Sequence, residues 1–268
     1  MPSWLRLYSR GTSIVATALS IVLALSVATF FVRASAGEAG APSGALARQE
    51  GFVPIFNGRD LDGWAGLPDY WSVRDGAIFG QETLENSKDT FLVFTRFELG
   101  ELQLRLKYKF LTSSGNSGVQ FRSKVLDRSN WTVGGYQADL DAEGGYDGSF
   151  YDQYGVAGGR NTLSKQGVET IWDTQNQHKE ILLSETAEQL RRVIRVGDWN
   201  ELEITAFGKC VVYKINGHVM TKMKDESYHF LKSGSIALQL HSGFTMGVLF
   251  KDIMVKKLSG DDEFPQCN

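Results

Sequence analysis

The sequence predicts an all-β protein, an antiparallel β-sandwich or jelly roll that carries one short helix. From Gly51 onward, short apolar or alternating runs follow one another closely, with Gly, Asn and Asp between them, a spacing typical of such folds. Residues 102–110 alternate strictly between Leu, Tyr or Phe and Gln, Arg or Lys, which predicts a strand with one buried and one wet face. Asn216-Gly217 stands between two apolar runs, which indicates a hairpin with a two-residue turn.

The individual elements follow from the same patterns. Strands are expected at residues 53–56, 71–73, 77–80, 91–94, 99–110, 118–123, 135–139, 199–207, 210–215, 234–240 and 248–258. The helix is expected at residues 187–194, because Thr186 can cap it and Gln189 completes a capping box. Residues 155–184 are the least regular part. A stretch of this length without structure is typical of a functional loop or a disordered segment. It could form one side of a binding site.

The N-terminal part predicts export. Arg6 and Arg10 precede a long apolar run, residues 12–32, and an Ala-Ser-Ala triplet follows it. Residues 1–36 therefore have the three regions of a secretory signal peptide. The run is also long enough to span a bilayer, so an uncleaved N-terminal membrane anchor stays the alternative. Residues 37–50, rich in Ala, Gly and Ser, indicate a flexible linker. The protein is expected to be secreted or periplasmic, either free or membrane-anchored.

Length, charge and cysteine count limit the classes of protein to which this chain can belong. Residues 51–258 are long enough for one domain with a sizeable core, and residues 259–268 form a polar tail. Removal of the leader takes 3 of the 28 basic residues and none of the 31 acidic ones, which leaves 25 minus 31, or −6. An acidic chain without a basic block argues against a nucleic-acid partner. Cys210 and Cys267 are too few for a cysteine metal site, and a disulfide between them stays open.

A polar face is the feature of the sequence that points most directly to function. Three predicted strands end with polar residues at alternate positions, and alternate side chains of a strand share one face. The three pairs are Gln120 with Arg122, Gln137 with Asp139, and Gln239 with His241. Amides and charged groups on one sheet surface are unfavourable unless they bind something polar. The pattern predicts a polar binding or catalytic face, whereas a purely structural protein would not bring the three glutamines together.

The order of several motifs resembles that of a known family. The motifs are FNGRDLDGW at 56–64, WSVRDG at 71–76, GNSGVQFR at 115–122, GYQAD at 135–139, WN at 199–200, ING at 215–217 and LQLHSG at 238–243. Their series is similar to that of the 3-keto-disaccharide hydrolase domain, formerly a domain of unknown function, and extends over residues 51–258. The resemblance implies a concanavalin A-like lectin/glucanase jelly roll and an exported enzyme acting on sugars with a ketone at C3. Residues 155–184 depart from the family's common pattern and leave the sugar itself open.

The chemistry that the resemblance implies would explain the polar face. A ketone at C3 acidifies the C2 hydrogen, so a base can remove it, the C1 substituent leaves and water adds back. His241 and Asp139 are the candidate base and acid, and Arg122 is a candidate donor to the enolate oxygen. The candidate substrate-binding residues are Gln120, Gln137, Gln239, Asn116, Tyr151, Asp152 and Trp131. The implied substrate is an oligosaccharide or a glycoside. The sequence specifies no cofactor, and a divalent metal held by Asp139 and His241 stays open.

Three other interpretations compete with this one. A lectin-like carbohydrate-binding module of the same fold would use the amides and aromatic side chains such as Trp131 and Trp172 without a base. Residues 139–143 place acids at alternate positions, so a continuing strand would resemble the acid triad of jelly-roll glucanases that use two carboxylates. Arg122 could instead form a structural ion pair with Asp139, and neither group would then take part in catalysis.

Overall fold

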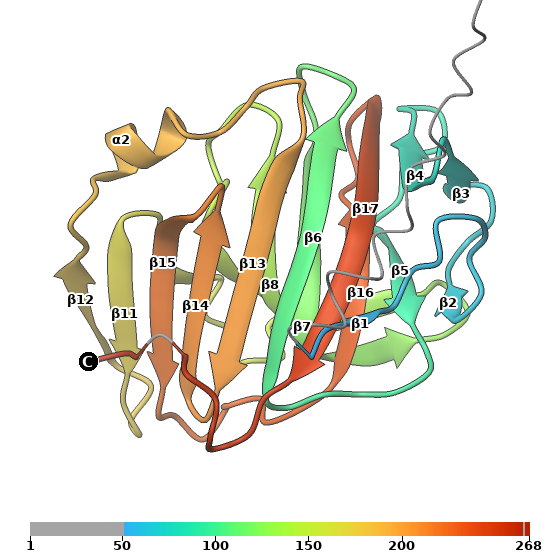
Figure 1. Ribbon diagram of the computed structural model, residues 1–268. Coiled ribbons are helices and arrows are strands. Elements are labelled where there is room, and N and C mark those ends of the chain that lie inside the picture. Colours follow the sequence, from blue (N-terminus) through green and yellow to red (C-terminus); the bar gives the residue numbers. More distant parts are fainter. Residues whose placement is uncertain (1–50, 265) are drawn as a thin grey trace, which may run out of the picture. The chain divides into compact units, whose positions relative to one another are not determined.

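The computed structural model describes residues 51–264 and 266–268, and the predicted leader and linker, residues 1–36 and 37–50, lie outside this part. In the described residues the regular structure is almost entirely β, arranged as two packed sheets with one short helix (Figure 1). The predicted all-β sandwich is confirmed. No helix in this part of the chain is long and apolar enough to cross a membrane.

The large sheet has ten strands. They are β1 (Val53–Pro54), β3 (Trp71–Arg74), β4 (Ala77–Glu82), β6 (Leu102–Phe110), β11 (Val168–Trp172), β12 (His178–Leu182), β13 (Asn200–Phe207), β14 (Cys210–Ile215), β15 (His218–Asp225) and β17 (Met246–Lys257). Their order is β12-β11-β15-β14-β13-β6-β17-β4-β3, and β1 pairs with β17. Neighbouring strands are antiparallel except β11 and β15, which run parallel. Figure 1 shows this sheet in front.

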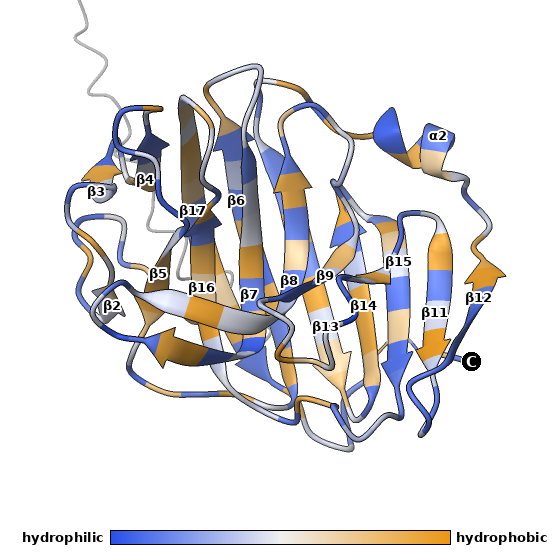
Figure 2. Cartoon of the chain, turned by 180° about the vertical axis from the view of Figure 1, so that it is seen from behind, coloured by the Kyte–Doolittle hydropathy of each residue, from blue (hydrophilic) through white to orange (hydrophobic). Residues whose placement is uncertain are grey.

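The small sheet has seven strands and lies behind the large one. They are β2 (Trp64–Ala65), β5 (Thr90–Phe94), β7 (Asn116–Asp127), β8 (Thr132–Asp141), β9 (Phe150–Gln153), β10 (Thr162–Ser164) and β16 (Ser235–Leu240). Their order is β10-β9-β8-β7-β16-β5-β2. Figure 2 views the protein from this side, where hydrophilic and hydrophobic residues alternate along the strands.

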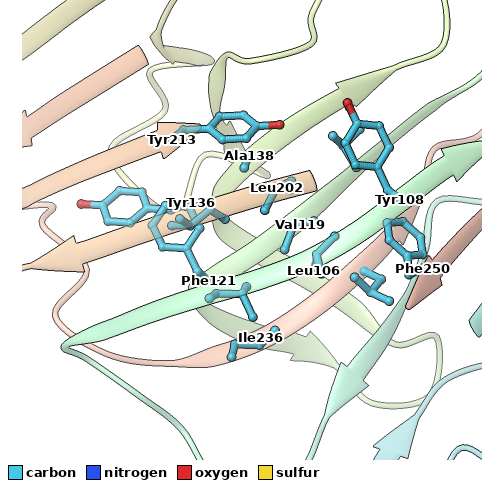
Figure 3. Close-up of a cluster of buried hydrophobic side chains, with 14 of the residues drawn as sticks. Leu106, Tyr108, Val119, Phe121, Tyr136, Ala138, Leu202, Tyr213, Ile236 and Phe250 are labelled. Carbon is cyan, nitrogen blue, oxygen red and sulfur yellow. The ribbon is translucent and has the colours of Figure 1, made fainter. Parts of the chain in front are cut away.

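The core lies between the inner faces of the two sheets. On β6 buried and half-buried residues alternate over the whole strand, as the sequence predicts. Figure 3 shows side chains of both sheets meeting in the core. Those that it labels are Leu106, Tyr108, Leu202, Tyr213 and Phe250 from the large sheet, and Val119, Phe121, Tyr136, Ala138 and Ile236 from the small sheet. Burial of these large apolar side chains is the main stabilisation of the fold.

The local signals of the sequence are largely reproduced. The helix α2 (Ala187–Arg191) is shorter than predicted, and its capping box of Thr186 and Gln189 is present. Asn216 and Gly217 join β14 to β15 with φ angles of 51° and 85°, the left-handed backbone that a type I′ turn requires. These features depend on neighbouring residues alone, which explains why the sequence predicts them.

The expectation of an irregular segment at residues 155–184 is wrong. The segment contains β10, β11 and β12, which add strands to both sheets. Trp172 is buried on β11, its Nε1 donates to the Leu163 carbonyl at 2.9 Å, and the Arg160 guanidinium lies 4.6 Å from its ring centre. Trp172 is therefore not available for stacking on a sugar. The strands were missed because each is short and set among Gly, Asn and Gln residues.

The polar tail is fixed to the large sheet. Cys210 and Cys267 form a disulfide with a Cα–Cα distance of 5.6 Å, which answers the question that the sequence left open. The ring of Phe264 stacks on Phe207 at 3.9 Å between centres. Asn268 donates from its backbone and side-chain nitrogens to Glu169 at 2.6 and 2.7 Å. These contacts carry the tail across β13, β14, β15 and β11 on the side away from the core.

Candidate functional site

The three glutamines of the predicted polar face lie on the outer face of the small sheet. Their neighbours in sequence Val119, Ala138 and Leu238 point into the core, so the glutamines point away from it. Cross-strand register brings them together, because Gln120 pairs with Gln137, Gly118 pairs with Asp139, and Gln239 pairs with Gly118. We call this set, Gly118, Gln120, Gln137, Asp139 and Gln239, the glutamine face. The sheet supplies it from β7, β8 and β16.

A chain of hydrogen bonds fixes the orientation of two of the amides. Ser123 Oγ donates to Gln120 Oε1 at 2.6 Å, Gln120 Nε2 donates to Gln137 Oε1 at 2.6 Å, and Gln137 Nε2 donates to Asp139 Oδ1 at 2.7 Å. Gly118 makes this arrangement possible, since a side chain there would collide with the side chain of Gln137. The chain ends at one oxygen of Asp139. The other, Oδ2, accepts no hydrogen bond from the described residues.

Asp139 has the electrostatics of a base that works near neutral pH. Only 5% of the residue is exposed, and burial raises the pKa of its carboxyl to about 7, against the opposing effect of the Gln137 hydrogen bond. The negative charge of Asp141 adds to the increase in the pKa. A buried carboxylate whose pKa lies near the working pH can both take and return a proton.

A folded-over hairpin covers the apolar residues beside the glutamine face. The register of β7 and β8 shifts between Phe121 and Lys124, and beyond this point the hairpin crosses the outer side of the sheet (Figure 2). Val125, Trp131 and Val133 of the hairpin pack against outward-facing apolar residues of β5 and β16. Those residues are Phe91, Val93 and Ala237. Trp131 is half-buried in this cluster, so it lies beside the glutamine face.

Arg122 is not part of the glutamine face, and the prediction that it shares a face with Gln120 is wrong. Its φ angle of 51° is left-handed, which breaks the alternation at the point where β7 bends. The guanidinium donates to the carbonyls of Gly100 at 2.7 Å and Gly208 at 2.9 Å, and to Glu101 Oε2 at 3.3 Å. The suggested ion pair with Asp139 is therefore absent. Arg122 ties β7 to two loops of the large sheet.

His241 lies at the end of the glutamine face with a fixed imidazole. Leu240 before it points into the core, and the His241 side chain is 44% exposed. Its Nδ1 lies 2.8 Å from the carbonyl of Ser242, to which it can donate, and 3.8 Å from Asp89 Oδ1. Nε2 makes no hydrogen bond to the described residues. If Nδ1 carries the proton, Nε2 is the free lone pair, or the donor when the ring is charged.

Asp89 and Tyr154 join the site although sequence reasoning missed both. Asp89 Oδ1 accepts from the Ser242 amide at 2.8 Å, and Asp89 Oδ2 accepts from the Tyr154 hydroxyl at 3.1 Å. Asp89 precedes β5 and Tyr154 follows β9. No local pattern marks these residues, because only the packing of distant loops brings them to His241.

The remaining candidates divide between the two sides of the sheet. Tyr151 pairs with Gln137 on the outer face, and partial burial, followed by the charge of Asp139, raises the pKa of its hydroxyl. Asn116 is half-buried, and its carbonyl accepts from the His241 amide at 3.2 Å. Asp152 pairs with the core residue Tyr136, so the expectation that it lies on the face is wrong.

Two of the acids predicted near the site hold loops instead. Asp152 accepts from the amides of Ala157 at 2.6 Å and Arg160 at 3.1 Å, which shapes the loop after β9. Asp141 accepts from the amides of Glu143, Gly145 and Tyr146 at 2.9, 2.9 and 3.1 Å, which closes the turn after β8. Since β8 ends at Asp141, the acids at residues 139–143 do not form the continuous triad of a glucanase strand.

The described residues contain no group of three or more His, Cys, Asp or Glu side chains arranged to hold a metal ion. His241 and Asp89 are close to each other, but Nδ1 of the imidazole already faces a backbone carbonyl.

The two packed sheets and the polar outer face define the class of the protein as a predominantly antiparallel β-sandwich with a candidate binding face on the smaller sheet. The chain belongs to the family of 3-keto-alpha-glucoside-1,2-lyase-like domains, whose model matches residues 51–256. The family predicted from the motifs is thereby confirmed. No curated protein matches the chain.

Solved structures share the fold. A candidate glycosyl hydrolase from Parabacteroides distasonis has 19% sequence identity and a TM-score of 0.51, and the match covers 80% of this chain and 97% of that one. A protein of unknown function with a galectin-like fold from Bacillus subtilis has 10% identity and a TM-score of 0.50, covering 74% and 90% of the two chains. At these identities the likeness concerns the fold alone.

Proposed function

We propose that this protein cleaves the C1–O bond of 3-keto glycosides, with Asp139 as the general base. The observation that carries the proposal is the Asp139 carboxyl itself. It lies on the polar face with a pKa of about 7, and one oxygen is held by Gln137 while the other accepts no hydrogen bond from the described residues. A module that only binds sugars needs no such group.

The reaction follows from the acidity of the C2 hydrogen. Asp139 takes the proton from C2, and the electron pair of the C–H bond forms the enolate of the C3 ketone. The C3 carbonyl then re-forms, a double bond forms between C1 and C2, and the C1–O bond breaks. The leaving oxygen takes a proton from the His241 imidazolium. The products are an alcohol and an unsaturated 3-keto sugar, and addition of water at C1 completes a hydrolysis.

The enolate oxygen requires a donor close to the base. Tyr151 is the candidate for this role, because it is the cross-strand partner of Gln137 and keeps its proton at neutral pH, its pKa being raised by burial and by Asp139. A neutral hydroxyl in a partly buried site stabilises a developing negative charge better than water does. Tyr151 therefore takes the place that the sequence interpretation gave to Arg122.

A lectin-like binding module is the second candidate function. The observation that favours it is the number of amides on the glutamine face, since amides and a bordering aromatic side chain such as Trp131 suit sugar hydroxyls. In that case Asp139 would accept a hydroxyl hydrogen bond and would take no proton from carbon.

Product analysis with the full chain separates the two functions. The substrates are methyl 3-keto-α-glucoside, 3-keto disaccharides and their unoxidised parents, with and without a chelator. We expect cleavage of the keto sugars alone, and an Asp139→Asn variant that is folded but about 10²- to 10⁴-fold slower. The matched control is Glu203→Gln on the large sheet, which should keep full activity. Full activity in Asp139→Asn would overturn the role of the base, and binding without turnover on every sugar would establish the lectin.

We also propose that the protein is exported. The basis is the charged start, the apolar run at residues 12–32 and the Ala-Ser-Ala triplet after it. Expression in a bacterial host followed by fractionation and N-terminal sequencing tests this. A chain that starts at Gly37 outside the cytoplasm indicates cleavage, an intact chain in the membrane indicates an anchor, and an intact chain in the cytoplasm contradicts export.

A further inference from the structure

We propose that Gln239 is a binding subsite for a pair of hydroxyl groups on the sugar ring and that Tyr154 covers it until the sugar enters. The proposal rests on the proposed function, which supplies the sugar, and it adds a subsite and a gate. Its starting point is an unusual side chain. Gln239 is completely buried, and neither its Nε2 nor its Oε1 has a hydrogen-bond partner in the described residues.

The neighbouring amides show that the lack of hydrogen-bond partners is specific to Gln239 and is not shared by the other amides of the glutamine face. Gln120 and Gln137 are equally buried on the same face, and both are bound in the hydrogen-bond chain that ends at Asp139. The backbone carbonyl of Gln239 is also satisfied, since Ser117 Oγ donates to it at 2.6 Å. A buried amide without partners is costly, and such groups in native proteins call for a specific explanation.

The position of Gln239 points to a ligand of the same site. Its cross-strand neighbours are Gly118 and Phe91, and Gly118 in turn pairs with Asp139. His241 follows two residues later on the same side of the strand. The amide of Gln239, which has no hydrogen-bond partner in the described residues, thus lies between the proposed base Asp139 and the proposed acid His241, where we place the sugar ring.

The chemistry of the amide selects the ligand class. Nε2 offers donors and Oε1 accepts, so the group requires partners of both kinds at neighbouring positions. Adjacent hydroxyl groups on a hexose ring meet this requirement, because one can accept from Nε2 while the next donates to Oε1. An apolar aglycone would leave both atoms unsatisfied.

Tyr154 is the part of the cover that can move. Its ring centre lies 6.5 Å from that of Phe91, the neighbour of Gln239, and its hydroxyl donates to Asp89 beside His241. The side chain therefore lies beside Phe91, the cross-strand partner of Gln239, and reaches Asp89, which lies close to His241. Tyr154 is 47% exposed and has a φ angle of 56°. Side-chain hydrogen bonds with Asp89, at 3.1 Å, and with Gln153 hold its hydroxyl, and these two bonds must break when the ring swings aside.

Two substitutions test whether the Gln239 amide is kept for binding. Gln239→Leu replaces an unsatisfied group with an apolar one of similar size, so we expect the melting temperature to stay the same or to rise. The matched control is Gln120→Leu, which removes a partner from both Ser123 and Gln137 and should lower the melting temperature. A decrease for Gln239→Leu as large as that for Gln120→Leu would show that a hidden structural partner, such as a buried water, satisfies Gln239, and it would overturn the proposal.

Binding is measured without turnover in the Asp139→Asn background, by calorimetry with methyl 3-keto-α-glucoside. Adding Gln239→Leu should weaken the affinity about tenfold. Adding Tyr154→Phe, which keeps the ring and removes the bond to Asp89, should strengthen it severalfold because the cover opens more easily. Unchanged affinity in the Gln239→Leu variant overturns the subsite, and weaker binding in the Tyr154→Phe variant overturns the gate. Sugar binding with these effects but no turnover in the wild type would instead contradict only the proposed reaction.

Discussion

The two outer faces of the sandwich differ in how their polar groups are satisfied. The outer face of the large sheet contains a hollow of about 490 Å³ whose lining includes six charged side chains. These charges are paired with one another: Arg105 and Lys214 contact Glu203 at 2.8 and 3.2 Å, and Lys107 contacts Asp252 at 3.2 Å. The disulfide-bonded tail contacts Cys210 and Glu169 of the same sheet.

The outer face of the small sheet has the opposite character. It holds the buried Asp139, whose carboxyl has a pKa of about 7, and the side-chain amide of Gln239, which has no hydrogen-bond partner in the described residues. Half-exposed ion pairs on the large sheet are stable as they are and contribute little either way. Buried polar groups without hydrogen-bond partners lower the stability of the fold, and they remain free to bind a ligand. The comparison teaches that the two faces differ in whether their polar groups are satisfied, and the proposed function rests on the face with the unsatisfied groups.

Breaking the disulfide should affect the large-sheet side most strongly and leave the chemistry intact. The bond joins residues 57 positions apart, so its loss should lower the free energy of unfolding by about 3–4 kcal/mol. We expect the double variant Cys210→Ser/Cys267→Ser to unfold at lower denaturant concentration and to keep its activity within about twofold at 25 °C. Loss of activity in a sample that is still folded would show that the tail supports the small-sheet face, contrary to the comparison.

Replacing Arg122 should decrease stability and not catalysis. Arg122→Ala leaves the carbonyls of Gly100 and Gly208 and the carboxylate of Glu101 without their donor, and we expect a loss of about 3 kcal/mol in the free energy of unfolding. Chemical denaturation measures it. Arg74→Ala, at an exposed ion pair, is the control and should change little. If Arg122→Ala kept its stability and lost turnover on keto sugars, Arg122 would belong to the site after all.

The proposed role of Asp139 predicts that activity and stability change in opposite directions with pH. The base must be ionised, so kcat/KM should rise about tenfold per pH unit as the pH approaches about 7 from below. Stability should change in the opposite direction. A carboxyl whose folded-state pKa is raised binds its proton more tightly when folded, so the free energy of unfolding falls as pH rises from about 4 to about 7.

Asp139→Asn provides the control for this stability slope. In this variant the decrease in the free energy of unfolding between about pH 4 and about pH 7 should lack the contribution of Asp139. Part of the slope should remain, because burial raises the pKa of Asp147, at the end of the sandwich, to about 8. Urea denaturation at several pH values measures both slopes, and identical slopes in wild type and variant would contradict the raised pKa of Asp139.

The smallest effect is expected on the outer face of the large sheet. Lys107→Ala removes a half-exposed partner of Asp252 and should change the free energy of unfolding by no more than about 0.5 kcal/mol. Affinity for methyl 3-keto-α-glucoside, measured by calorimetry, should not change. A clear loss of sugar affinity would mean that the hollow on this face binds substrate and would reverse the comparison.

Prediction from sequence succeeded where neighbouring residues decide the structure. The alternation of β6, the capping box at Thr186 and the turn at Asn216 are local and were all predicted. The same holds for the glutamine face, since a two-residue period places Gln120, Gln137 and Gln239 on one side of their strands. The prediction failed at Arg122, where one left-handed residue reverses the period.

The sequence by itself determined the sandwich, its family and the residues that face outward, because these follow from periodicity and turn chemistry along the chain. Only the tertiary structure decided which of those residues act together. Asp89 and Tyr154 reach His241 from two distant loops, and Asp139 acquires a pKa of about 7 from its burial in the folded protein. Burial, pairing and the lack of a partner depend on contacts between remote parts of the chain, which local patterns do not encode.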